Sequence, residues 1–158
     1  MKVFLSYALS PFEGALASRL RAVALAYNVE LLLPNTDKRN LLPAGNKRKI
    51  KQSDAVIVLV TNNAQQVNSV HLEIAEASRE KKPLIAFVES PHLIAGIPPT
   101  QVIVFNRANL TQHENRLFEV LQQIQAQKNV SEAATVLGAI GLVVLGFLAL
   151  GALTKDGK

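Results

Sequence analysis

The chain has 158 residues, a formal net charge of +5 and no cysteine. This length allows one domain with an appendage. The lack of cysteine excludes disulfides, thiol catalysis and cysteine-ligated metals, and it fits a reducing compartment.

Short apolar runs alternate with longer amphipathic segments through residues 1–127. The central runs consist of β-branched residues and leucine, which is typical of a parallel sheet covered by helices on both faces. We therefore expect an α/β fold, a flavodoxin-like five-stranded parallel sheet. In chain order the pattern predicts a strand at Lys2–Tyr7, a helix at Pro11–Tyr27 that Ser10 caps, a strand at Val29–Leu33, a polar stretch from Asn35 to about Lys51 with a short helix near its end, a strand at Asp54–Thr61, a helix that reaches Glu80, strands at Leu84–Val88 and Gln101–Phe105, and a helix at Thr111–Gln127.

The run Ala133–Leu153 holds 21 residues without a charge, and its only hydroxyl belongs to Thr135. As a helix it would reach about 30 Å, the thickness of the hydrocarbon core of a bilayer. We expect a transmembrane helix here, after a linker at 128–132 and before a short polar tail at 154–158.

The first residues lead straight into a strand and contain no secretory signal. We therefore expect a single-pass protein of the cell membrane whose N-terminal domain, residues 1–127, is cytoplasmic. Ala134 and Gly138 form a small-xxx-small pair that would allow the membrane helix to associate with another copy.

Sites in parallel α/β sheets lie beyond the carboxyl ends of the strands, which here points to Ser6–Glu13, Pro34–Gly45 and Thr61–Ser69. None of these segments carries a glycine-rich phosphate motif. The three histidines are scattered without ligand spacing, so no metal site is expected.

Glu73 is the candidate catalytic residue of the helix that reaches Glu80. Val67, Val70, Ile74 and Ala77 predict its buried stripe, and Glu73 falls about 80° from the centre of that stripe, at its edge. Glu76 and Glu80 lie farther round, where a solvated face is expected. The residues alone leave two interpretations open, a functional carboxylate at the crevice and a partly exposed surface glutamate.

Several motifs in this order resemble the Toll/interleukin receptor (TIR) domain, and the resemblance covers roughly residues 1–127. They are Phe4-Leu5-Ser6-Tyr7 at the end of the first strand, Leu42-Pro43-Ala44-Gly45 after the second, Val70-His71-Leu72-Glu73-Ile74 in the helix after the third, and Lys82-Pro83-Leu84-Ile85. Many TIR enzymes place a tryptophan a few residues before the glutamate, whereas this chain has none and carries Ser69 and Val70 there.

The resemblance implies cleavage of the nicotinamide–ribose bond of NAD, to a linear or cyclic product, with Glu73 as the catalytic residue and no further cofactor. A fixed carboxylate suits this reaction, because nicotinamide leaves neutral and positive charge grows on the ribose. The candidate nucleotide-binding residues are Ser6, Tyr7, Phe12, Asp37, Arg39 and Ser69. Phe12 could stack on a base or simply pack in the core.

The resemblance also implies self-association through the loop at Pro43–Gly45 and a role in bacterial antiviral defence signalling. Six basic residues lie within 38–51, and they could bind pyrophosphate, attract anionic lipid or form a solvated face. Nucleic-acid binding is not expected, because the cluster lacks interleaved aromatic residues. Two alternatives remain: a non-catalytic adaptor that binds other TIR domains at the membrane, and a nucleoside deoxyribosyltransferase-like enzyme.

Overall fold

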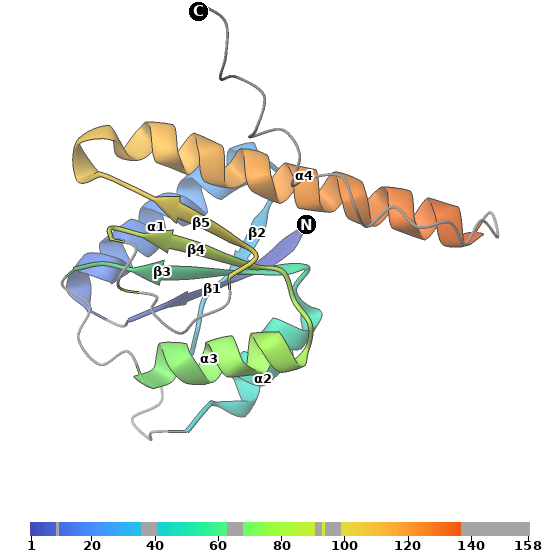
Figure 1. The fold of residues 1–158 in the computed structure, drawn as a ribbon. Coiled ribbons are helices and arrows are strands. Elements are labelled where there is room, and N and C mark those ends of the chain that lie inside the picture. The colour runs from blue at the N-terminus through green and yellow to red at the C-terminus, as the bar shows by residue number, and fades with distance from the viewer. Residues whose placement is uncertain (9, 36–40, 63–67, 91–92, 94–98, 137–158) are drawn as a thin grey trace, which may run out of the picture. The chain divides into compact units, whose positions relative to one another are not determined.

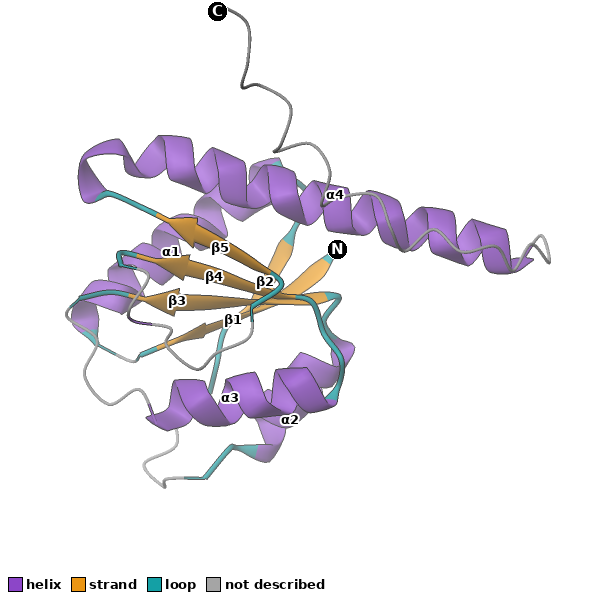
Figure 2. Ribbon diagram, in the orientation of Figure 1, coloured by secondary structure: helices purple, strands orange, loops and turns teal. Residues whose placement is uncertain are grey.

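A computed structural model of the chain describes residues 1–8, 10–35, 41–62, 68–90, 93 and 99–136. Figure 1 shows its elements along the chain, and Figure 2 separates the strands from the helices. The elements are β1 (Lys2–Tyr7), α1 (Pro11–Ala26), β2 (Glu30–Leu32), α2 (Ala44–Gln52), β3 (Ala55–Val60), α3 (Asn68–Arg79), β4 (Leu84–Val88), β5 (Gln101–Val104), a 3-10 turn (Arg107–Asn109) and α4 (Leu110–Val136).

The strands form one parallel sheet in the order β2-β1-β3-β4-β5, which confirms the predicted five-stranded flavodoxin-like architecture. All residues of β3 and β4 are buried, as expected for central strands covered on both faces. One hydrophobic core joins the sheet to α1 and to the part of α4 before residue 125, and a second joins it to α2 and α3. Helices therefore cover both faces of the sheet (Figure 1).

The order of the strands creates a topological switch point between β1 and β3. From β1 the chain passes through α1 to β2 at one edge, and it then returns through α2 to β3 on the other side of β1. The carboxyl ends of β1 and β3 therefore lie side by side, with α1 and α3 on opposite faces of the sheet. This is the position at which ligands bind to open α/β sheets.

The start of α1 follows the sequence signals closely. Ser10 is the N-cap, its hydroxyl oxygen accepts a hydrogen bond of 3.3 Å from the Glu13 amide, and Pro11 is the first helical residue. The helix ends at Ala26, and Asn28 then takes a left-handed conformation (φ 55°), which asparagine tolerates better than most residues. The predicted cap and both helix ends are thus correct to within one residue.

The start of α2 differs from the prediction for the loop after the second strand. Pro43 is the N-cap with φ −59°, and Gly45 already belongs to the first turn of the helix. The fixed φ of proline is compatible with a helix start, so the proposed Pro43–Gly45 loop is the beginning of a helix instead.

The chain divides into two compact units, Met1–Gln125 and Ala126–Lys158. Helix α4 extends past the predicted end at Gln127, so the predicted linker at 128–132 is helical. Among the described residues no helix is sufficiently long and apolar to cross a bilayer. Most of the predicted membrane span, from residue 137 onward, and the tail at 154–158 lie outside the described residues.

Candidate active site

Glu73 lies in α3 and turns its carboxylate inward, toward the carboxyl end of β1. The side chain is buried, with an exposed fraction of only 2%. Its Oε2 accepts a hydrogen bond of 2.6 Å from the Ser6 hydroxyl, and its Oε1 accepts one of 2.8 Å from the Asn46 amide. Glu73 is therefore neither a surface residue nor half-buried, and each carboxylate oxygen has a defined donor.

Three elements place these groups together. Ser6 follows Phe4 on the side of β1 that faces α2 and α3, because side chains alternate along a strand. Val70, Ile74 and Ala77 hold α3 against the same face, as its predicted stripe requires. Helix α2 packs against α3, so it covers the edge where Glu73 was expected to meet solvent.

Burial raises the pKa of Glu73 from its ordinary value to about 7. The hydrogen bonds from Ser6 and Asn46 and the charge of Lys49 act in the opposite direction, because each stabilises the carboxylate. A pKa near neutrality means that small changes in these contacts shift the ionised fraction strongly.

Tyr7 is the second predicted residue beside this carboxylate. It is half-buried at the end of β1 and packs against the core on the α1 side of the sheet. Burial raises the pKa of its phenol, and the nearby negative charge of Glu73 raises it further. Ser6 and Tyr7 thus meet Glu73 from one strand, one through a hydrogen bond and the other through charge.

A second buried carboxylate, Glu13, lies in the first turn of α1, on the face of the sheet opposite α2 and α3. Its side chain is fully buried, and its Oε1 accepts a short hydrogen bond from the Thr61 hydroxyl at the end of β3. Its Oε2 has no hydrogen-bond partner among the described residues. The two carboxylates therefore flank the switch point from opposite faces of the sheet.

Phe12 precedes Glu13 in the first turn of α1. The Arg107 guanidinium lies 4.0 Å from the centre of its ring and also pairs with the Glu89 carboxylate, whose Oε2 accepts a hydrogen bond of 2.7 Å from the Asn62 amide. One face of the predicted stacking ring is thus occupied by a cation. The structure brings Ser6, Tyr7 and Glu73 together and places Phe12 in this other cluster.

The remaining predicted site residues are less informative. Ser69 is exposed in the first turn of α3, one turn before Glu73. Asp37 and Arg39 lie outside the described residues. The expectation that Glu76 is solvated was wrong: its side chain is buried and pairs with Arg79, with a closest distance of 2.6 Å between Arg79 Nη2 and Glu76 Oε1.

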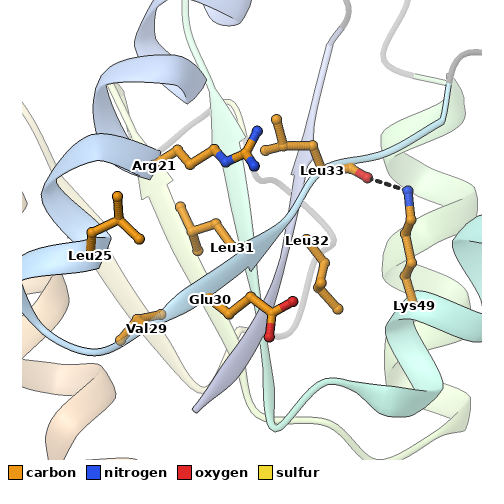
Figure 3. Close-up of a pocket in the computed structure, with 8 residues that line it drawn as sticks. All are labelled: Arg21, Leu25, Val29, Glu30, Leu31, Leu32, Leu33 and Lys49. Carbon is orange, nitrogen blue, oxygen red and sulfur yellow. Dashed lines mark hydrogen bonds between the residues drawn. The ribbon is translucent and has the colours of Figure 1, made fainter.

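A hollow of about 310 Å³ lies beside the edge strand β2, and Figure 3 shows the residues that line it. Leu25 and Arg21 of α1 and Lys49 of α2 lie around Leu31–Leu33 there, and the Lys49 ammonium donates to the Leu33 carbonyl (Figure 3). Within the described part of the chain, no group of three or more His, Cys, Asp or Glu side chains is arranged to bind a metal ion.

No protein-family model matches the sequence, and no curated protein matches it. Among solved structures, the sugar isomerase domain of an RpiR transcription factor from Sphaerobacter thermophilus is similar with a TM-score of 0.51 and 14% identity, over 85% of this chain and 76% of that one. A CMP N-glycosidase from Clostridium botulinum is similar with a TM-score of 0.48 and 19% identity, over 78% of this chain and 99% of that one. A 2-deoxyribosyltransferase from Bacillus psychrosaccharolyticus is similar with a TM-score of 0.46 and 14% identity, over 58% of this chain and 74% of that one. At 14% identity the likeness to the isomerase domain describes the fold alone, and the TIR resemblance stays a prediction.

Sequence reasoning missed Asn46, Glu13 and Thr61. A signal for Asn46 was present, since it lies four residues before the buried Ile50 and thus on the same face of a helix. Glu13 was inconspicuous because an acidic residue in a first helical turn is expected for electrostatic reasons alone. Thr61 bounds an apolar strand, where a hydroxyl ordinarily meets solvent.

Proposed function

We propose that the chain is an N-glycosidase of nucleotides that cleaves the nicotinamide–ribose bond of NAD by means of Glu73. The observation that supports this most is the buried carboxylate of Glu73 at the carboxyl end of β1, next to the switch point, with one hydrogen-bond donor on each oxygen. A carboxylate held in this way keeps its orientation and interacts strongly with charge, because few competing water dipoles surround it.

The reaction makes one principal demand on the protein. When the bond between C1′ and the pyridinium nitrogen breaks, its electron pair stays with the nitrogen, and nicotinamide leaves neutral without a general acid. The ribose acquires oxocarbenium character, and a carboxylate held close to it stabilises that positive charge. Attack of water at C1′ then gives ADP-ribose and releases a proton, whereas attack by a nucleophile within the same molecule would give a cyclic product.

The raised pKa of Glu73 has a direct consequence for this reaction. Only the ionised form offsets positive charge, so the free protein is half competent near pH 7 and more competent above it. A bound cationic substrate favours the ionised carboxylate, so it lowers the pKa of Glu73 in the complex. Binding of the cationic substrate thus increases the ionised fraction of Glu73 in the complex.

The biological setting that we propose follows the sequence. A membrane helix at 133–153 would tether the domain to the cell membrane on its cytoplasmic side and raise its local concentration, which favours self-association. The TIR resemblance supports contacts between copies near Pro43 and Gly45 and a role in bacterial antiviral defence signalling.

A non-catalytic adaptor is the second candidate function. Two observations favour it: the chain lacks the tryptophan of many TIR enzymes, and Glu73 is only 2% exposed. In that role, Glu73 would join β1, α2 and α3 rather than meet a substrate, and the surface of the domain would bind other TIR domains.

The test is release of nicotinamide from NAD by the full chain, free and on liposomes, beside the variant Glu73→Gln. CMP and a 2′-deoxynucleoside belong in the same panel, because two of the structural neighbours are named for acting on such compounds. The proposal expects release that depends on Glu73 and increases on liposomes. No release under any clustering condition, with retained binding of TIR domains, would leave the adaptor. Base release from CMP or exchange on the deoxynucleoside would reassign the substrate.

A further inference from the structure

The side-chain amide of Asn46 bonds to two separate parts of the chain. Its Oδ1 accepts a hydrogen bond of 2.7 Å from the Asn35 backbone N–H, and its Nδ2 donates to the Asn35 carbonyl at 3.3 Å and to Glu73 Oε1 at 2.8 Å. Both N–H groups and the carbonyl oxygen of the amide are thereby used, and only one orientation of the amide satisfies all three contacts. With an exposed fraction of 1%, Asn46 cannot take water in their place.

Lys49 makes a parallel connection three residues later on α2. Its ammonium donates to the Leu33 carbonyl at 2.8 Å, as Figure 3 shows, and to the Asn35 side-chain oxygen at 2.6 Å. The charge of Lys49 also stabilises the ionised form of Glu73. Two polar side chains of α2 therefore hold the segment that leaves β2, and both act on the same carboxylate.

Gly45 explains how closely that segment fits α2. A Cβ atom at this position would clash with the side-chain nitrogen of Asn35, and Lys49 holds the other end of the same side chain. Any side chain at position 45 must therefore move the side chain of Asn35, the residue whose backbone carries both other partners of Asn46.

We propose that Asn46 is a positioning residue that couples the backbone at Asn35 to the orientation and ionisation of the Glu73 carboxylate. The inference rests on the proposed function of Glu73. Displacement of Asn35 pulls the amide of Asn46 out of line, and Glu73 then keeps only the Ser6 donor. The titratable groups that act on Glu73 from the packed elements, Tyr7 on β1 and Lys49 on α2, remain in place. The segment after β2 thus regulates the active site.

The variant Asn46→Leu keeps the approximate shape of the side chain and removes its hydrogen bonds. Titration of Glu73 in the full chain, followed by NMR of the side-chain carboxyl carbon, should show its pKa rising by about 1. The kcat/KM for nicotinamide release at pH 7 should fall about fivefold and recover at higher pH, because the ionised fraction of the free protein is what changes. A merely structural role would lower activity equally at every pH.

Gly45→Ala provides a second variant that leaves Asn46 and Glu73 intact. It should move the pKa of Glu73 in the same direction by displacing Asn35, and the double variant Asn35→Ala/Gly45→Ala should restore it, since the clash disappears while the Asn35 backbone partners remain. An unchanged Glu73 pKa in folded Asn46→Leu overturns the coupling. The NMR titration needs no activity, so an absence of nicotinamide release in the wild-type chain, together with the expected pKa shifts, would reject the proposed function alone.

Discussion

The two faces of the sheet each hold one buried carboxylate at the switch point, and the two carboxylates have different hydrogen-bond partners. On the side of α2 and α3, Glu73 has a donor on each oxygen, from Ser6 and from Asn46. On the side of α1, Glu13 accepts from Thr61 through one oxygen, while its other oxygen has no partner among the described residues. Burial alone therefore does not define the candidate catalytic group.

The difference lies in what fixes each carboxylate. Two donors on opposite oxygens fix both the position and the rotation of Glu73, which a carboxylate facing a developing cation requires. A single hydroxyl fixes Glu13 at one point, and the nearby Arg107 is already paired with Glu89. We therefore assign the chemistry to Glu73 and a structural connection between β3 and α1 to Glu13.

The largest expected effect separates the two carboxylates by activity. Glu73→Gln should lower nicotinamide release by about 10²–10³-fold, as loss of one preorganised electrostatic group typically does. Glu13→Gln, the matched change on the other side, should stay within about threefold if the protein remains folded, as circular dichroism would check. Equal losses of activity in both variants would mean that the reaction depends on both carboxylates.

A second prediction concerns stability and pH. Because the pKa of Glu73 is about 7 when folded and lower when unfolded, the folded state binds more protons between these values. The free energy of unfolding should therefore fall as pH rises from about 5 to about 8, by about 1–3 kcal/mol in all from this residue. Glu73→Gln should lack this contribution and be the more stable protein at about pH 8.

Urea unfolding at several pH values measures that contribution. The difference between wild type and Glu73→Gln should grow with pH up to about 8 and then level off. A difference that is constant across this range would show that Glu73 has an ordinary pKa in the folded protein.

A third prediction concerns the hydrogen bond between Thr61 and Glu13. Thr61→Val should lower the free energy of unfolding by about 1–3 kcal/mol, because it removes the donor of a fully buried carboxylate. Thr61→Ser keeps the hydroxyl and should be closer to wild type. If valine were as stable as threonine at this position while serine was destabilising, the methyl packing and not the hydrogen bond would matter.

The smallest effect is expected at Phe12. Phe12→Leu should lower the free energy of unfolding by roughly 0.5–1 kcal/mol through loss of the contact with Arg107, while Phe12→Tyr keeps that contact. KM for NAD should not change in either variant. A raised KM in Phe12→Leu alone would support the predicted base-stacking role and show that the substrate spans both sides.

The strands were the most predictable part of the molecule. The uninterrupted apolar runs at Leu84–Val88 and around Ala55–Val60 can only be buried on both faces of a sheet, and the structure has them there. The signals around Ser10 and Pro11 located the start of α1 in the same way, since capping depends on neighbouring residues. Local chemistry determines such features, so the sequence reveals them.

The site was only partly predictable, because its contacts join residues distant in the chain. Helical periodicity placed Glu73 at the edge of a stripe, but whether an edge is open or covered depends on the neighbouring helix. Helix α2 covers it here and contributes Asn46 from 27 residues away. The short basic sequence of α2 suggested a solvated face, whereas one face of it is buried through Asn46 and Ile50.

The pH dependence of kcat/KM for NAD cleavage by the full chain tests the central claim most directly, because it reports the ionisation of the free protein. We expect a rise with a midpoint near the Glu73 pKa of about 7 and a plateau above it. The residual activity of Glu73→Gln should lack this rise. A profile without a rise near neutral pH, or the same rise in Glu73→Gln, would contradict the assignment of the reaction to this carboxylate.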